Sequence, residues 1–170
     1  MVASQGTVTH LLSCCDAIYL GLGETAPKLT NDANVVRVHE MSRSFGELAL
    51  SMRQYLGESD VEPLDIIYET LLRAFIDDPT GSMTLYAMAL VIGPRLLVSL
   101  RDAREASRTD GDVTALLEHA AQVTVAEIRS IATMAQDEHI IDDPSWEAAA
   151  RGLRTAVETA GNADSFGLSR

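Results

Sequence analysis

The sequence predicts an all-α protein: a single-domain bundle of five or six helices, with a buried central helix that is kinked or broken at Gly93-Pro94. Apolar residues recur at intervals of three and four along most of the 170 residues. Glycine, proline and aspartate mark the ends of these stretches. No stretch alternates apolar and polar residues as a half-buried strand does. We therefore expect one domain over residues 1–160 and a flexible tail over 161–170.

The first third of the chain predicts two amphipathic helices. The first is expected to be short, because Gly21 and Gly23 are expected to end it. Asn31 or Asp32 is expected to cap the second, which runs to about Leu56 before Gly57. The two apolar faces consist of Val8, Leu11, Leu12, Cys15, Ile18, Tyr19 and Leu22, and of Val35, Val38, Met41, Phe45, Leu48, Ala49, Met52 and Tyr55.

The middle of the chain predicts a third helix from Asp60 and Pro63 to Ile76, interrupted by Asp77-Asp78-Pro79. Nearly every residue from Met83 to Leu100 is apolar, so this segment is expected to form the buried centre of the bundle. Proline removes a helical hydrogen-bond donor, which is why Gly93-Pro94 is expected to kink or split it.

Two more helices are expected in the last third. One opens near Asp110 or Asp112 and extends towards His139. Its inner stripe contains Val113, Leu117, Ala120, Thr124, Ile128, Ile131 and Ala135. The last helix starts at Asp143 and Pro144 and ends near Gly161.

The charge of the chain bears on its partners and its location. A net charge of -12 repels nucleic-acid phosphate and anionic lipid, so we expect no direct nucleic-acid binding. The apolar run from Met83 to Leu100 is nearly long enough to span a bilayer, but Arg95 lies inside it, so no membrane span is expected. Cys14 and Cys15 are adjacent, with one expected to face the core and the other to face outward. No basic residue precedes an apolar leader, and a cytoplasmic location is expected.

Two sequence motifs resemble known sites but lack their context. Residues 21–26 match the dinucleotide pattern G-x-G-x-x-A, yet no parallel strands follow. His39-Glu40 begins like a zinc-protease motif, but Arg43 stands where the second histidine ligand is required. Glu40, Arg43 and Glu47 are therefore interpreted as ion-pairing neighbours on a solvated helix face.

The densest polar cluster is a candidate metal site formed by Glu138, His139, Asp142 and Asp143. The alternative is that these carboxylates stabilise the start of the next helix. Glu127 is a candidate general acid or base if it is half-buried, and otherwise the partner of an arginine at the surface edge. Arg95 is a candidate partner for Glu127 inside the bundle.

Two functions follow from these patterns. The first is a non-enzymatic helical interaction or regulatory protein that self-associates, with a dimer favoured, and that binds a basic protein partner through apolar stripes and acidic junctions. The second is a helical bundle that binds a ligand or a metal in a pocket near Gly93-Pro94. An enzyme is one form of this second function. That pocket would be lined by Phe45, Met52, Met83, Tyr86, Met88, Arg95 and Glu127. No cofactor is expected.

Overall fold

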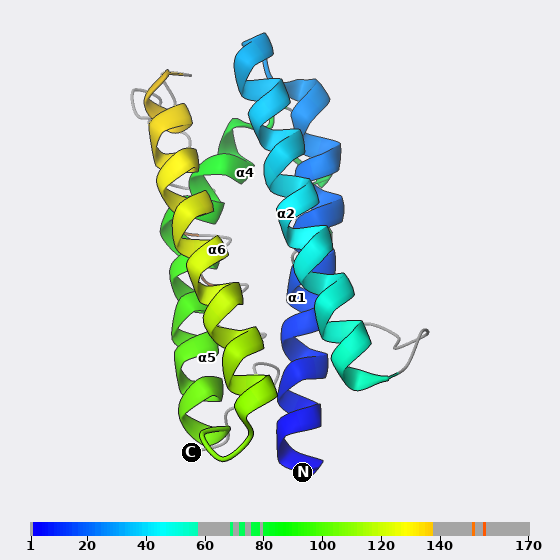
Figure 1. Cartoon of the computed structure of the whole chain (residues 1–170). Coiled ribbons are helices and arrows are strands. Elements are labelled where there is room, and N and C mark those ends of the chain that lie inside the picture. Colours follow the sequence, from blue (N-terminus) through cyan, green and yellow to red (C-terminus); the bar gives the residue numbers. More distant parts are fainter. Residues whose placement is uncertain are drawn as a thin grey trace.

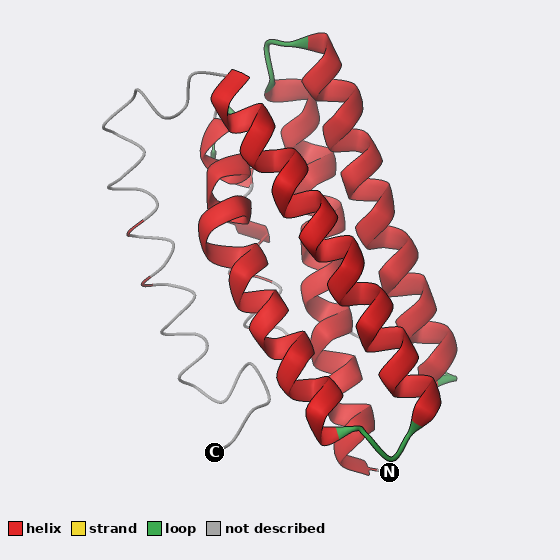
Figure 2. Ribbon diagram, turned by 60° about the vertical axis from the view of Figure 1, so that its left-hand side comes forward, coloured by secondary structure: helices red, strands yellow, loops and turns green. Residues whose placement is uncertain are grey.

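The computed structural model describes residues 2–57, 69, 72–73, 76–78, 80–137, 151 and 155. Within these residues the chain is helical and contains no strand, which confirms the predicted all-α class. Four long helical segments lie along roughly one direction (Figures 1 and 2). They are α1 (Val2–Thr25), α2 (Asp32–Leu56), the continuous run of α4 (Ser82–Ala87), η2 (Met88–Ile92) and α5 (Gly93–Ala106), and α6 (Gly111–Asp137).

The four segments pack as two antiparallel pairs. Helix α1 packs along α2, and α5 packs along α6 (Figure 1). Contacts of α2 with α6 and of α1 with α5 join the pairs around one core. The largest side chains that are completely buried in this core are Leu12, Ile18, Leu22, Met41, Phe45, Leu48, Met52, Leu85, Met88, Leu100 and Leu117. These residues come from every segment, so each segment buries the apolar stripe that its sequence predicts.

Helix α1 is longer than the sequence predicts. It continues through Gly21 and Gly23 to Thr25, and the short 3-10 turn η1 (Ala26–Lys28) follows directly. A glycine inside a helix costs only about 1 kcal/mol. Leu22 is completely buried and Thr25 Oγ1 donates a hydrogen bond to the Gly21 carbonyl at 2.8 Å, so packing holds this last turn in the helix. The expectation that the glycines end the helix is therefore wrong.

Helix α2 has the ends that the sequence predicts. The Asn31 side-chain oxygen accepts a hydrogen bond from the Ala33 N–H at 2.9 Å, which caps the first turn. Gly57 ends the helix with a φ of 71°, a left-handed conformation that glycine adopts without steric penalty. Its buried face includes Val38, Met41, Phe45, Leu48, Ala49 and Met52.

Cys14 and Cys15 are both buried, against the expectation that one of them faces outward. Helix α1 contacts both α2 and α5, so the apolar environment covers more of its circumference than a single stripe. Burial raises the pKa of Cys14 to about 12 and raises the pKa of Cys15 well above its ordinary value. Both thiols are therefore protonated and shielded at neutral pH.

We expect the native protein to react with an aromatic disulfide reagent at pH 8 far more slowly than the urea-unfolded protein, in which both thiols are free. Thiolates are the reactive species, and the fold suppresses both ionisation and access. The absorbance of the released thiolate measures the rate. A Val36→Cys variant is the control, since Val36 is 59% exposed, and its added thiol should react at once. Rapid labelling of two thiols in the native wild-type protein would contradict the burial.

Hydrogen bonds connect η1, which follows α1, to the segment before α4. Lys28 Nζ donates hydrogen bonds to the carbonyl oxygens of Ile76 and Asp78, at 3.1 and 2.8 Å. The buried Asp78 carboxylate accepts from the backbone N–H groups of Thr80 and Thr84, at 3.1 and 2.7 Å. Such charge-assisted bonds satisfy donors at the beginning of a helix. Asp78, placed by sequence at a helix break, thus organises the entry to α4.

The apolar central segment contains a π-helical turn, Met88–Ile92, directly before Gly93-Pro94. The Gly93 N–H donates to the Met88 carbonyl, five residues back. Thr84–Ala106 is the one helix within the described residues that is long and apolar enough to cross a membrane, and 61% of its apolar window is buried. Its burial is incomplete, since Leu90 and Val98 are 50% and 47% exposed. The segment is therefore buried along one part of its surface, and the expected burial of the whole segment is not confirmed.

Helix α6 matches its prediction closely. Asp110 Oδ1 accepts the Val113 N–H at 3.2 Å and so caps the first turn. Val113, Leu117, Ala120, Thr124 and Ile131 are buried. Most of the third predicted helix, all but Arg151 and Thr155 of the last one, and the tail over 161–170 lie outside the described residues.

Candidate functional site

An open groove of about 630 Å³ lies between α1 and α2 at the surface. Because the two helices are antiparallel, it extends from the Asp16 and Arg53 end to the Glu24 and His39 end. This is about 12 Å along α1, at 1.5 Å per residue. Its lining residues are Asp16, Tyr19, Leu20, Gly23 and Glu24 from α1, and His39, Ser42, Arg43, Gly46, Glu47, Leu50 and Arg53 from α2.

Small residues of α2 fix the position of Tyr19 in the groove. Ser42 Oγ donates a hydrogen bond to the Tyr19 carbonyl at 2.7 Å, which ties α1 to α2. A Cβ atom added to Gly46 would lie 3.0 Å from Tyr19 Cδ2, so the tyrosine ring lies directly against the Gly46 backbone. Tyr19 was expected on the buried face of its helix, but its side chain is 42% exposed. The ring is therefore presented in the groove instead of the core.

Three large apolar side chains in the groove are exposed to solvent. Tyr19, Leu20 and Leu50 are 42%, 40% and 54% exposed. Isolated exposed leucines are common on protein surfaces. Here all three line one concavity, and apolar side chains gathered in this way are characteristic of binding surfaces.

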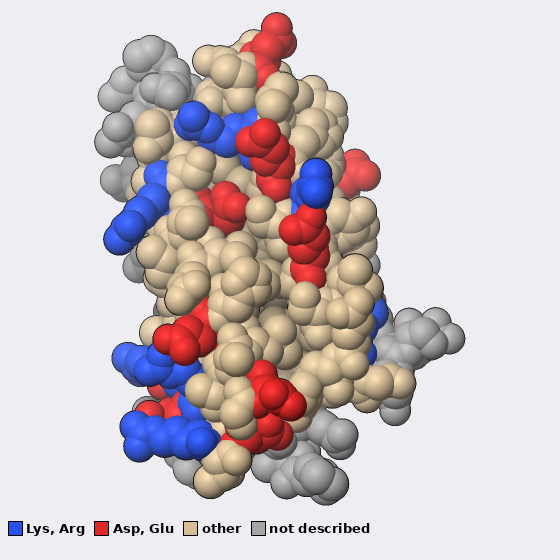
Figure 3. Space-filling model, viewed as in Figure 1, with Lys and Arg blue, Asp and Glu red and all other residues tan. Residues whose placement is uncertain are grey.

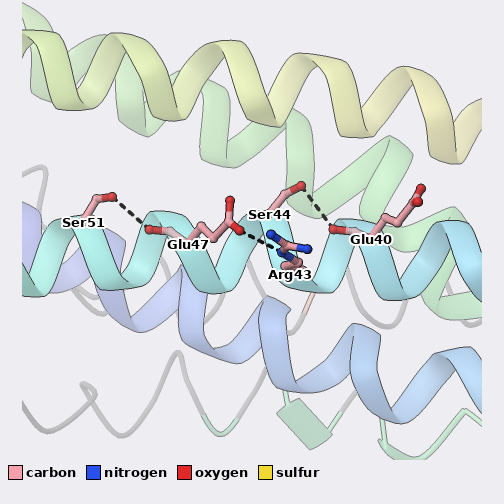
Figure 4. Close-up of polar contacts among 5 residues, drawn as sticks. All are labelled: Glu40, Arg43, Ser44, Glu47 and Ser51. Atoms are coloured by element: carbon pink, nitrogen blue, oxygen red, sulfur yellow. Dashed lines mark hydrogen bonds and ion pairs between the residues drawn. The ribbon is translucent and has the colours of Figure 1, made fainter.

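The charges of the groove are largely neutralised within it. Arg53 forms an ion pair with Asp16 across the two helices, and the aspartate side chain is only 10% exposed. Arg43 Nε donates to Glu47 Oε1 at 2.8 Å along the outer face of α2 (Figure 4). The second pair confirms the Arg43–Glu47 part of the ion pairing predicted there, whereas Glu40 joins no ion pair among the described residues. The pair is well exposed, so it contributes little to stability. Three carboxylates against two guanidinium groups give the groove a net charge of -1 with His39 neutral.

Acidic and basic side chains also lie close together on another part of the surface that can be seen directly. On the face in Figure 3, acidic and basic side chains lie next to one another, and a largely uncharged band separates the upper and lower groups. The chain as a whole carries -12. With -1 over its 12 lining residues, the groove thus has about the same net charge per residue as the whole chain.

The residues proposed from the sequence as a ligand pocket lie elsewhere. Phe45, Met52 and Met88 are completely buried in the core. Tyr86 is partly buried and packs against that core, and Met83 lies in α4 although its side chain is outside the description. None of the described side chains among them lines the groove between α1 and α2.

Arg95 and Glu127 are both half-buried, on α5 and α6 respectively. The ion pairs found among the described residues do not join these two side chains, so their pairing gains no support. The candidate metal ligands Glu138, His139, Asp142 and Asp143 lie outside the described residues. Within the part that is described, no three His, Cys, Asp or Glu side chains form a group able to hold a metal.

Comparisons with family models, curated proteins and solved structures found no significant match to this chain. The structure defines the class of protein: all-α in its described residues, with an open groove between its first two helices.

The sequence held a partial signal for this groove. Ser42 and Gly46, one helical turn apart on α2, are small enough to admit a neighbouring side chain, and Gly23 faces Ser42 from α1 at 3.7 Å from an added Cβ to the hydroxyl. The sequence prediction placed Gly23 at a helix end, where it would not belong to this pattern of small residues. The pairing of α1 with α2 was needed to place Tyr19, Leu20 and Leu50 in one surface.

Proposed function

We propose that this protein is a non-enzymatic helical interaction protein, and that the face formed by α1 and α2 is its docking surface. The observation that carries the proposal is the groove, in which exposed Tyr19, Leu20 and Leu50 are bordered by two ion pairs. An apolar centre within a polar rim is the usual composition of protein–protein interfaces, and tyrosine is enriched among their energetically dominant residues.

The partner that fits this surface is another helical face with few unbalanced charges. A deep catalytic site would need converging polar groups in an enclosed cavity. The groove is instead open, and its charged side chains are mostly occupied by one another. These features favour docking over chemistry, and they favour a protein partner over a small molecule.

Several features that the sequence predicts complete the proposal. We propose that residues 1–160 form one bundle of five or six helices, with the central segment kinked at Gly93-Pro94, where a π-helical turn precedes the proline. A cytoplasmic location and contacts of the acidic junctions with a basic partner are part of the same proposal, supported by the net charge of -12.

Site-specific photo-crosslinking tests the docking surface. A photo-reactive amino acid is placed at Leu50 or at Leu90 of the full chain in growing cells. The two positions are similarly exposed, at 54% and 50%, but only Leu50 lines the groove. We expect a discrete adduct from position 50, little from position 90, and loss of the adduct when Leu20→Gln is added. No adduct at position 50, or equal adducts at both positions, would overturn the proposal.

A further inference from the structure

Resting on the proposed single bundle over residues 1–160, we propose that the helix predicted from Asp143 to Gly161 docks on the outer face of α5. This is the side of the continuous α4–η2–α5 run that points away from the core. Its exposed apolar part consists of Leu90, Pro94 and Val98, which we call the outer stripe. The occupant of this stripe is thus the C-terminal segment of the same chain.

The outer stripe is a continuous apolar surface. Leu90 and Val98 are 50% and 47% exposed, and Pro94 between them is exposed as well. Residues four apart lie on one side of a helix, so the three side chains form a strip about 12 Å long. Apolar side chains that are contiguous in this way mark a surface that another element covers.

Neither α2 nor α6 presents a comparable stripe. On the outer face of α2, exposed Val36 and Leu50 are separated by the exposed charged side chains of Glu40, Arg43 and Glu47. Helix α6 exposes no large apolar side chain among its described residues. Of the helices beside the end of α6, α5 therefore offers the best surface for an apolar helix face.

The predicted C-terminal helix has one apolar face that requires a partner. Arg151 and Thr155 are helical and exposed, and their spacing of four residues places them on one side of the helix. At about 100° per residue, Trp146, Leu153 and Val157 lie on the opposite side. A helix with one solvated face buries the other, so this apolar face packs against the bundle.

Chain connectivity places this helix beside α5. Helix α6 contacts α4 as well as α5, and its 27 residues span about the length of the whole α4–η2–α5 run. Asp137 at its end therefore lies near the level of Ser82 at the start of α4. Only residues 138–142 separate Asp137 from the predicted helix start at Asp143. Short connections join helices that are antiparallel neighbours, so the last helix runs back in the direction of α5.

The length of the last helix matches the length of the apolar surface. From Asp143 to Gly161 the helix advances about 27 Å, which brings its end to about the level of Val98. The next exposed side chains on the outer face of α5 are the charged Arg101 and Glu105. The predicted helix therefore ends where the apolar surface ends, and it leaves the charged part of α5 in contact with water.

Docking of this helix has a consequence for the proposed function. It covers the exposed side of the most apolar helical segment among the described residues. The groove between α1 and α2, with Tyr19, Leu20 and Leu50, is then the apolar surface left for a partner.

Thiol protection in the full-length protein tests the docking. Leu90 and Val36 are similarly exposed in the described helices, at 50% and 59%. The thiol of Leu90→Cys is nevertheless expected to react with an aromatic disulfide reagent at least about tenfold more slowly than that of Val36→Cys, because the docked helix opens only in a minor population. Cys14 and Cys15 are buried, so the fast phase belongs to the added thiol.

A matched pair of charges on the last helix tests which of its faces is docked. Leu153→Asp puts a carboxylate on the apolar face, so it should raise the labelling rate of Leu90→Cys towards that of Val36→Cys. Thr155→Asp adds the same charge to the exposed face and should leave the rate unchanged. Far-UV circular dichroism checks that both variants remain folded.

The fluorescence of Trp146 provides a second measurement, because it is the only tryptophan of the chain. We expect Leu90→Gln to shift its emission to longer wavelength and to increase its quenching by acrylamide. Leu50→Gln is the control, since Leu50 is similarly exposed but lies in the groove, and it should change neither quantity. Both side chains are about half exposed, so neither substitution should unfold the bundle.

Three outcomes would overturn the inference. They are equal labelling rates for Leu90→Cys and Val36→Cys, equal effects of Leu153→Asp and Thr155→Asp, and a protection of Leu90→Cys that is lost on dilution. The last result would assign the outer stripe to a second copy of the chain. In each case a discrete crosslink from position 50 would leave the docking surface between α1 and α2 standing.

Discussion

Replacing Phe45 with alanine is expected to lower the free energy of unfolding by about 3–5 kcal/mol. The Phe45 side chain is completely buried in the core that α2 shares with its neighbours. Truncation therefore removes a large apolar contact area and leaves a cavity that the rigid surroundings fill only in part. Urea denaturation, followed by circular dichroism at constant protein concentration, measures the change.

A Val36→Ala variant is the control for Phe45, because Val36 lies on the same helix but is 59% exposed. Its free energy of unfolding should change by less than about 0.5 kcal/mol, as is usual for a surface position. A loss below about 1 kcal/mol for Phe45→Ala would show that the ring borders a space open to water. That result would favour the ligand pocket predicted from the sequence, of which Phe45 is a lining residue.

Gly93→Ala is expected to destabilise the protein by about 2–3 kcal/mol, near the upper end of the usual cost of overpacking. An added Cβ would lie 2.5 Å from Ile128 Cγ1 on α6 and 2.6 Å from the Met88 carbonyl oxygen. The second contact involves the carbonyl that accepts the π-helical hydrogen bond, so side-chain movement alone cannot relieve it. Chemical denaturation compares the variant with the wild type.

Gly6→Ala is the matched control, since an added Cβ at Gly6 meets nothing within 4 Å. Alanine is the better helix former, so this change should stabilise the protein by about 0.5–1 kcal/mol. In the background of Ile128→Ala, Gly93→Ala should cost less than in the wild type but should still be destabilising, because the contact with Met88 remains. A neutral Gly93→Ala would contradict the close packing of the π-helical turn against α6.

Substitutions at Phe45 and Gly93 distinguish the core from the proposed docking surface. Changes at Phe45 and Gly93 should alter unfolding strongly, whereas changes at Leu20 and Leu50 should alter association with little effect on unfolding. Exposed side chains contribute little to the folded state, so the second group can serve binding without a large cost in stability.

Local signals in the sequence were sufficient for the class of fold and for several helix ends. Gly57 ends its helix as predicted, and the caps at Asn31 and Asp110 are each one of the two candidates that the sequence offered, because capping depends on a residue and its immediate neighbours. The buried stripes of α2 and α6 were also predicted, since a period of 3.6 residues follows from helix geometry alone. The ion pair between Arg43 and Glu47 belongs to this group, because its partners are four residues apart on one helix.

Tertiary structure alone decided which faces meet and which remain exposed. The continuation of α1 past Gly23, the burial of both Cys14 and Cys15, and the exposure of Tyr19 all depend on which helices lie beside α1. The groove depends on the same pairing, since its two walls lie far apart in the sequence. Periodicity determines that a helix has an apolar side, but only the contacts between helices determine how much of that side is covered.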